Sequence, residues 1–168
     1  MKTLISEDQI REKVLECAMW VNQEYTDTEV ILVFILKGSI CFVADLIREL
    51  TIPFQIEPIS AASYGMRGTV PGPVEITQPV SLSLEGKEVL LVDDIFDTGS
   101  TLTEVIKYLE RLNPKRVRAL VLLRKIRGVL PPLVPDYVCF DIEDRFVVGY
   151  GLDYKEHNRG LKAIYTIE

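Results

Sequence analysis

The hydrophobic positions of this chain fall into two patterns that alternate along its length. Apolar runs with few interruptions occur at 30–36 and 88–92, and such runs are typical of strands that are covered on both faces, as in a parallel sheet. Apolar residues at helical spacing occur between them, which predicts amphipathic helices at 7–24, 40–50 and 102–112. Further strands are expected at 54–65, 117–123, 137–142 and 146–148.

Local signals support this division of the chain. Ser6 and Gln9 have the spacing of a capping box, in which a hydroxyl and an amide satisfy the first backbone N–H groups of a helix. Between 66 and 85 the chain is rich in Gly, Pro, Ser and Thr, so we expect a long mobile loop or hairpin there, of the kind that often covers an active site. Strands that alternate with helices, without an internal repeat or a linker, predict one α/β domain over 1–168.

Polar residues gather where the predicted strands end. Lys37 follows the first buried strand, a polar turn at 93–99 follows the strand at 88–92, and Lys125 and Asp153 follow later strands. Ligands of open α/β sheets bind outside the carboxyl ends of the strands. The sequence therefore predicts a ligand site at this edge of the sheet.

Composition narrows the class of protein. The net charge of −6 and the lack of a basic stripe argue against nucleic acid as a partner. No apolar run approaches the roughly 18 residues of a membrane-spanning helix, and the N-terminal segment becomes polar too soon for a secretory signal. Cys17, Cys41 and Cys139 have neither disulfide nor zinc spacing, and the single His157 argues against a histidine-rich metal site. We therefore expect a cytoplasmic protein with no membrane partner.

The segment 89–102, VLLVDDIFDTGSTL, carries the densest set of functional groups. An apolar strand leads through two aspartates into a turn that opens a helix. Backbone N–H groups at a helix start form a cradle for an anion, and Gly99 allows such an anion to approach closely. The hydroxyls of Thr98, Ser100 and Thr101 add donors for phosphate oxygens.

Asp93 and Asp94 are unexpected beside an anion site unless they face a cation or a polyol. Ribose hydroxyls and Mg²⁺ both qualify, because carboxylates are hard oxygen ligands. The chain has neither the G-x-x-x-x-G-K-[ST] pattern of a P-loop nor the G-x-G-x-x-G pattern of a dinucleotide site. The residues alone do not decide between ribose hydroxyls and Mg²⁺ as the partners of Asp93 and Asp94.

The segment 89–102 resembles the phosphoribosyl-pyrophosphate signature of type I phosphoribosyltransferases. Four further segments are similar to hypoxanthine-guanine phosphoribosyltransferases, in the order of that family: Leu36-Lys37-Gly38-Ser39, Ser63-Tyr64-Gly65, Leu123-Arg124-Lys125, and 145–154 with its continuation to Arg159. The resemblance spans most of the chain. It implies an α/β fold with a mostly parallel central sheet flanked by helices, a small hood and a long mobile loop. It also implies purine salvage, in which phosphoribosyl pyrophosphate and hypoxanthine or guanine give IMP or GMP and pyrophosphate.

The resemblance assigns roles around the purine. Asp97 would be the general base that accepts the N7 proton while the bond to N9 forms, and Lys125 would donate to O6. An ammonium has donors only, so it favours a 6-oxo group over the 6-amino group of adenine. Phe146 would stack on the base, Val147 would offer main-chain hydrogen bonds, and Asp153 would lie at the purine edge near a second Mg²⁺.

The remaining residues would hold the phosphoribosyl and pyrophosphate groups. Asp93 and Asp94 would bind the ribose hydroxyls and position Mg²⁺, although the family more often has Glu-Asp at this pair. The Leu36–Lys37 peptide would be cis and would face the pyrophosphate. The other implied contacts are Gly38, Ser63, Tyr64, Thr98, Gly99, Ser100, Thr101 and Arg159.

Three competing functions stay open at this point: transfer to xanthine or another base, RNA-binding regulation on the same scaffold, and a purely structural role. Lys125 and the segment 146–153 argue against adenine but not against xanthine. The net charge argues against the regulator. Asp97 and Lys125 together argue against a structural role, because nothing structural demands that pair. The resemblance suggests a homodimer or homotetramer, and no interface can be read from the chain.

Overall fold

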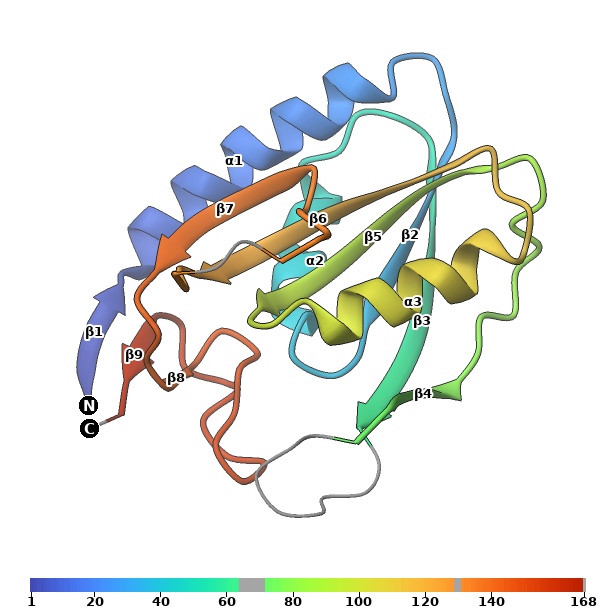
Figure 1. Ribbon diagram of the computed structural model, residues 1–168. Coiled ribbons are helices and arrows are strands. Elements are labelled where there is room, and N and C mark those ends of the chain that lie inside the picture. The colour runs from blue at the N-terminus through green and yellow to red at the C-terminus, as the bar shows by residue number, and fades with distance from the viewer. Residues whose placement is uncertain (64–71, 129–130, 168) are drawn as a thin grey trace.

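A mostly parallel sheet forms the centre of the molecule (Figure 1). The structure is a computed structural model, and it describes residues 1–63, 72–128 and 131–167. The strand order is β4-β3-β2-β5-β6-β7, in which β4 is antiparallel to β3 and the other neighbours are parallel. The strands are β2 (Val30–Ile35), β3 (Phe54–Ser63), β4 (Val74–Gln78), β5 (Glu88–Phe96), β6 (Arg116–Lys125) and β7 (Tyr137–Ile142).

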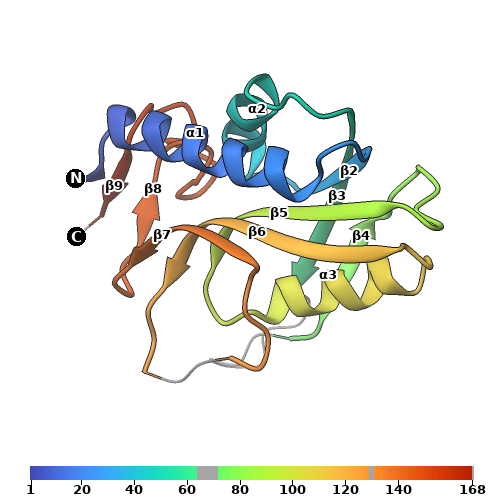
Figure 2. The same cartoon turned by 90° about the horizontal axis from the view of Figure 1, so that it is seen from above.

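Helices cover both faces of this sheet, which is why its central strands are apolar throughout (Figure 2). Helices α1 (Glu7–Glu24) and α2 (Ile40–Arg48) lie on one face, and α3 (Ser100–Glu110) lies on the other. Successive residues of a strand point to opposite faces. Leu32 and Leu90 accordingly pack in the core beneath α1 and α2, whereas Ile31 and Leu91 pack in the core beneath α3.

A small antiparallel sheet forms a hood beside the carboxyl ends of the main strands. Its order is β1-β9-β8, and its strands are β1 (Lys2–Ile5), β8 (Val147–Val148) and β9 (Ile164–Thr166). Because β1 pairs with β9, the two chain ends lie side by side (Figure 1). Val147 and Ile164 are buried in the same core as α1 and α2, so the hood is anchored to the main sheet by apolar packing.

The structure confirms the predicted α/β class and most element positions, with differences at their ends. The helix at 7–24 is confirmed, and the described part of 66–85 contains β4, which forms a hairpin with β3. The predicted turn at 93–99 is wrong at its start, since β5 continues to Phe96 because its ladder with β6 continues to Arg124. Strands β1 and β9 were not predicted, because both are short and their positions give no periodic signal. Among the helices that the structure describes, none is long and apolar enough to cross a lipid bilayer.

We expect Ser6→Ala to lower the free energy of unfolding by about 1 kcal/mol, because it removes an N-terminal cap. The Ser6 hydroxyl accepts a hydrogen bond from the Gln9 N–H at 3.2 Å, and Gln9 Oε1 accepts one from the Ser6 N–H at 2.8 Å. Urea unfolding measures the change. Ser83→Ala, at an exposed position of a loop, is the matched control and should leave stability unchanged. Equal effects of the two substitutions would contradict the cap.

Candidate active site

The predicted site residues come together at one edge of the main sheet. Parallel neighbours β2, β5 and β6 all end there, so the segments that follow them are adjacent in space. These segments carry Lys37 and Gly38 after β2, Asp97 after β5, and Lys125 as the last residue of β6. The hood loop between β8 and β9 supplies the remaining groups.

Asp93 and Asp94 lie side by side near the end of β5. Asp93 is 5% exposed. The Asp94 N–H donates to Asp93 Oδ1 at 2.9 Å, and the Ile95 N–H donates to Asp94 Oδ1 at 2.9 Å. Burial, together with the negative charge of Asp94, raises the pKa of Asp93 well above its usual range, and burial raises the pKa of Asp94 as well. A buried carboxylate and a half-buried one this close favour a cation or a set of hydroxyl donors beside them.

Close backbone packing joins Asp94 to the loop after β2 and to the hood. A Cβ added to Gly38 would lie 1.8 Å from Asp94 Oδ2, so the carboxylate lies directly against the Gly38 backbone. A Cβ added to Gly151 would lie 2.1 Å from the Gly38 carbonyl oxygen, and Gly151 has a φ of +99°, which favours glycine. The Leu36–Lys37 peptide beside them is cis, which confirms the expectation from the sequence.

The turn after β5 forms the start of α3. Gly99 is the N-cap of this helix with a φ of +84°, and Thr101 lies in the first turn. The Thr98 and Ser100 hydroxyl oxygens are 3.0 Å apart, and the Ser100 N–H donates to Thr98 Oγ1 at 3.4 Å. A helix N-terminus with hydroxyl donors around it binds anions well. The turn therefore has the donors that a phosphate cradle needs, and the cradle stays a prediction.

Two cations from distant segments share one carboxylate in the hood loop. Glu156 Oε2 is 3.1 Å from Lys37 Nζ and 3.2 Å from an Arg159 terminal nitrogen. The two cations lower the pKa of Glu156. Arg159 also pairs with Asp153 at 2.9 Å and donates to the Gly151 carbonyl at 2.8 Å. Sequence reasoning missed Glu156, although it lies inside the segment that the resemblance covers.

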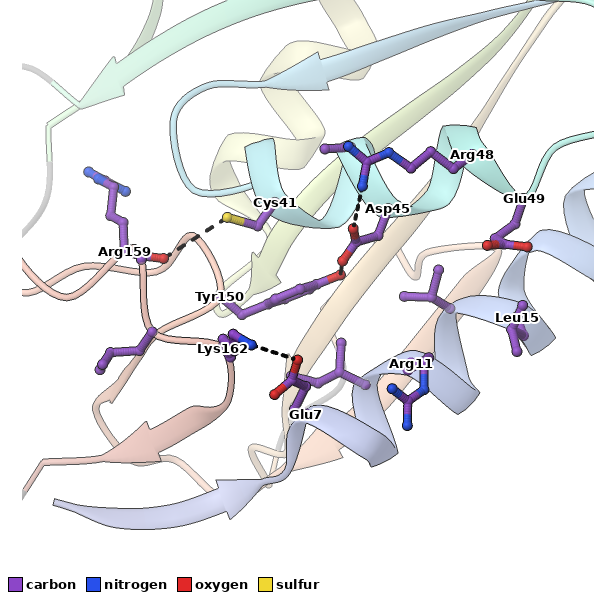
Figure 3. Close-up of a pocket in the computed structure, with 15 residues that line it drawn as sticks. Glu7, Arg11, Leu15, Cys41, Asp45, Arg48, Glu49, Tyr150, Arg159 and Lys162 are labelled. Atoms are coloured by element: carbon purple, nitrogen blue, oxygen red, sulfur yellow. Dashed lines mark hydrogen bonds and ion pairs between the residues drawn. The ribbon is translucent and has the colours of Figure 1, made fainter.

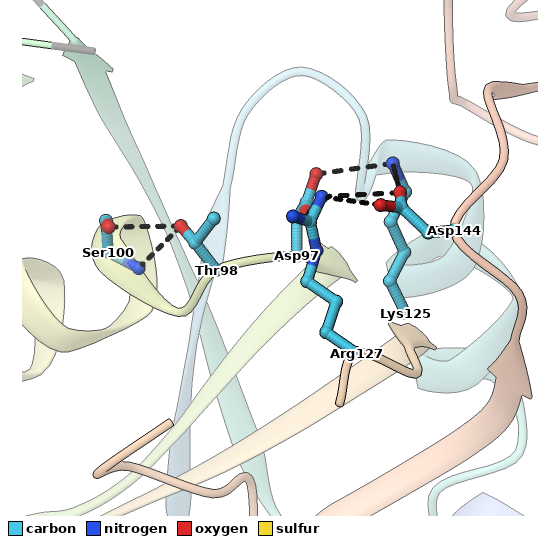
Figure 4. A network of polar contacts seen from close by, with 6 residues as sticks. All are labelled: Asp97, Thr98, Ser100, Lys125, Arg127 and Asp144. Atoms are coloured by element: carbon cyan, nitrogen blue, oxygen red, sulfur yellow. Dashed lines mark hydrogen bonds and ion pairs between the residues drawn. The ribbon is translucent and has the colours of Figure 1, made fainter. Parts of the chain in front are cut away.

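Lys125 and Asp97 form a second charged group on the other side of the site (Figure 4). Lys125 Nζ is 3.2 Å from Asp97 Oδ2 and 3.2 Å from Asp144 Oδ1. An Arg127 terminal nitrogen is 2.5 Å from Asp97 Oδ1 and 3.2 Å from Asp144 Oδ2. The sequence did not point to Arg127 or Asp144, because isolated charges next to a strand usually belong to a solvated surface.

The two predicted base contacts of the hood differ in exposure. Phe146 is 52% exposed and meets the Tyr154 ring edge-on, with ring centroids 5.5 Å apart. Val147 is buried in β8, where it pairs with Thr166 of β9. An exposed aromatic ring beside buried backbone is a suitable platform for a flat ligand.

Of the predicted loop residues, Ser63 is the last residue of β3 and is exposed. Tyr64 and Gly65 lie outside the described residues.

The three predicted metal ligands do not form one cluster. In the described ranges, no group of three or more His, Cys, Asp or Glu side chains is arranged to hold a metal ion. Asp153 is already engaged, because Oδ1 pairs with Arg159 and Oδ2 accepts from the Glu156 N–H at 2.8 Å. Asp93 and Asp94 fit Mg²⁺ of the kind that takes one or two protein carboxylates and completes its shell with water and substrate phosphates.

Three cavities adjoin this region. The first, of about 610 Å³, is lined by Asp97, Thr98, Lys125 and Arg127 among others. The second, of about 490 Å³, lies between α1, α2 and the hood loop (Figure 3). The third, of about 520 Å³, is lined by Thr98, Gly99 and Ser100 among others.

The predicted site residues divide unequally among these cavities. Only Arg159 lines the second cavity, which contains a hydrogen bond of 2.7 Å from the Tyr150 hydroxyl to Asp45. The first and third cavities are lined by the residues predicted to contact the base and the phosphate.

Comparison with known proteins shows which family this chain resembles in sequence and fold. The phosphoribosyl transferase domain matches residues 6–155. The chain is 37% identical to the hypoxanthine-guanine phosphoribosyltransferase of Aquifex aeolicus, over 100% of this chain and 95% of that protein. The crystal structure of a hypoxanthine-guanine phosphoribosyltransferase from Bacillus anthracis superposes with a TM-score of 0.93 at 38% identity, over 100% of this chain and 99% of the other.

The chain belongs to the hypoxanthine-guanine phosphoribosyltransferase family. A Staphylococcus aureus hypoxanthine phosphoribosyltransferase is similar to the same extent, with a TM-score of 0.94 at 33% identity over 100% of this chain and 91% of that one. The likeness is therefore one of fold over the full chain, with the hood included. The phosphoribosyltransferase signature at 89–102 lies on β5, the turn after it and the start of α3.

We expect Gly38→Ala to weaken the binding of phosphoribosyl pyrophosphate with Mg²⁺ by about tenfold or more, because a Cβ at this position must displace the Asp94 carboxylate. Isothermal titration calorimetry measures the dissociation constant. Gly128→Ala is the control, since no described atom lies within 4 Å of a Cβ at Gly128. Unchanged binding by the Gly38 variant would mean that Asp94 has no part in holding this ligand.

Proposed function

We propose that this protein transfers the phosphoribosyl group of phosphoribosyl pyrophosphate to N9 of hypoxanthine or guanine, which gives IMP or GMP and pyrophosphate. The observation that carries the proposal is the pairing of Asp97 with Lys125 at 3.2 Å, near a helix N-terminus and a pair of adjacent aspartates of which Asp93 is buried. Each of the three parts of a nucleotide thus has a suitable neighbour: a proton acceptor and a cation for the base, carboxylates for the ribose, and N–H donors for the phosphate.

Asp97 and Lys125 have different roles at the purine. As the bond to N9 forms, the purine N7 proton becomes acidic, and the Asp97 carboxylate accepts it. The Lys125 ammonium donates to O6, where negative charge collects as the proton leaves. Phe146 stacks on the ring, and the main chain of Val147 binds its edge.

The turn after β5 holds the phosphoribosyl group. The backbone of Thr98 to Thr101 binds the 5′-phosphate at the start of α3, where the helix dipole also favours an anion. Asp93 and Asp94 accept hydrogen bonds from the ribose hydroxyls. Burial raises the pKa of both carboxyl groups, and hydrogen bonds from the ribose hydroxyls to the carboxylates would compensate for part of that burial.

The cofactor that fits this site is Mg²⁺. Asp93 and Asp94 would hold one ion together with the substrate, and Asp153 would lie near a second. A bound Mg²⁺ neutralises charge on the pyrophosphate as it leaves.

Lys37, Gly38 and Arg159 bind the pyrophosphate group. Glu156 neutralises both cations in the protein without ligand, so the pyrophosphate oxygens replace its carboxylate. A guanidinium suits this exchange because it offers several donors in a fixed plane. The resemblance implies that Ser63 and Tyr64 contact the same ligand, and Tyr64 lies outside the described residues.

We also propose that the protein acts in the cytoplasm, since the free thiols of Cys17, Cys41 and Cys139 suit a reducing compartment. The homodimer or homotetramer suggested by the family stays a prediction.

The direct test is a spectrophotometric assay with Mg²⁺ and phosphoribosyl pyrophosphate, in which hypoxanthine, guanine, xanthine and adenine are offered separately. We expect turnover of hypoxanthine, guanine or both, and none of adenine, because Lys125 offers only donors to position 6. Preferential turnover of xanthine would select the alternative substrate. No turnover of any base by the folded protein would reject the proposed activity.

We expect Asp97→Asn to lower kcat by a factor of about 100 to 10,000, because an amide cannot accept the N7 proton. The dissociation constant of phosphoribosyl pyrophosphate should stay within experimental error, since Asp97 faces the base and not the phosphate cradle. Asp141→Asn is the matched control: Asp141 lines the same cavity, but its carboxylate binds Arg124. Equal losses of ligand binding and turnover in the Asp97 variant would point to a structural role.

A further inference from the structure

Four charged side chains form a closed arrangement next to the proposed base site, which we call the charge square: Asp97, Lys125, Arg127 and Asp144 (Figure 4). Positive and negative groups alternate around it, and each cation contacts both carboxylates. Lys125 lies 3.2 Å from each carboxylate, and Arg127 lies 2.5 Å from Asp97 and 3.2 Å from Asp144. The square has no net charge, and the resemblance to the family accounts for only two of its members.

The members of the square differ in exposure. The Lys125 side chain is 12% exposed, whereas those of Asp97, Arg127 and Asp144 are 40%, 42% and 49% exposed. A nearly buried ammonium needs partners in fixed positions more than an exposed one does, because water cannot replace them. Asp144 is therefore one of the fixed partners that the Lys125 ammonium needs.

Neighbouring charges do not compete for Asp144. Arg145, the next residue, pairs with Glu143 at 2.7 Å. Arg124, at the end of the same strand as Lys125, pairs with Asp141 through both carboxylate oxygens, at 2.6 and 2.9 Å. Asp144 thus faces Lys125 and Arg127 as its cationic partners in the described part of the chain.

The proposed reaction requires the square to open on one side. Both oxygens of Asp97 are engaged, Oδ2 by Lys125 and Oδ1 by Arg127, whereas the reaction requires one of them to meet the purine N7 proton. When the base enters and Asp97 turns toward it, Lys125 and Arg127 lose one carboxylate each. Asp144 still contacts both cations and keeps them from following Asp97.

We propose that Asp144 is a positioning residue for recognition of the base: it holds the Lys125 ammonium where the 6-oxo group of the purine arrives. This inference rests on the proposed function, because it needs Lys125 to donate to the base. Asp144 does not touch the substrate and acts through Lys125. Arg127 supplies the second positive charge, so that Asp97 and Asp144 can lie close to the same ammonium without repelling each other.

The test is a double-mutant cycle of Asp144→Asn and Lys125→Ala, with steady-state kinetics for hypoxanthine and calorimetry for phosphoribosyl pyrophosphate with Mg²⁺. We expect Asp144→Asn to raise the KM for hypoxanthine about tenfold, as the loss of a charged hydrogen bond would, while the dissociation constant of phosphoribosyl pyrophosphate is unchanged. Added to Lys125→Ala, it should change the KM by less than about twofold, because residues that act through one another are not additive. Asp144→Glu, which keeps the carboxylate, should restore part of the loss.

Glu143→Gln is the control for removal of a neighbouring carboxylate, because Glu143 pairs with Arg145 outside the charge square, and we expect it to keep the KM of the wild-type protein. An unchanged KM in Asp144→Asn would overturn the inference, and so would an undiminished effect in the Lys125→Ala background, which would mean that Asp144 acts through Arg127 or through the fold. Either result would leave the proposed function intact, because the wild-type protein would still turn over the base. An inactive wild-type protein would reject the proposed function and this inference together.

Discussion

The close approach of three backbone segments around Asp94 is the constraint on which the site depends. Gly38 has no space for a side chain because the Asp94 carboxylate lies against it, and Gly151 has none because the Gly38 carbonyl lies against it. The loop after β2, the end of β5 and the hood loop are stacked in this way. This stacking brings Arg159 of the hood within reach of the same Glu156 carboxylate as Lys37, although the two cations are far apart in the sequence.

This arrangement lets the charged side chains at both ends of the site neutralise one another. On the side of the hood loop, Lys37 and Arg159 share Glu156, and on the side of β6 the charge square is neutral by itself. Asp93 and Asp94 are the exception, because burial raises the pKa of both carboxyl groups and the negative charge of Asp94 raises that of Asp93 further. The proposed function places the ribose hydroxyls and Mg²⁺ beside these two carboxylates, because both are partners that a carboxylate binds well.

Some elements of the fold can be predicted from sequence patterns, and others cannot. The helix at 7–24 could be predicted closely, because its apolar spacing and its capping box are local properties. The end of β5 could not, because Asp93 and Asp94 look like turn residues and stay in the strand only through pairing with β6. Strands β1 and β9 were not predicted for a similar reason: they pair with each other, although they lie at opposite ends of the chain. The resemblance at 89–102 predicted a phosphate cradle at the turn after β5, but Glu156, Arg127 and Asp144 carry no signal of their own.

The sequence by itself determined the α/β class and the family, and it indicated the residues to which the chemistry is assigned in the proposed function, because apolar periodicity and short motifs depend on residues that are close together in the sequence. The tertiary structure decided which charges face one another. Asp144 and Lys125 lie on different segments, and a distance of 3.2 Å between them depends on the order of β6 and β7 in the sheet and on the path of the chain into the hood. Electrostatic pairing falls off over a few ångströms, so it is fixed only when the whole fold has placed both partners.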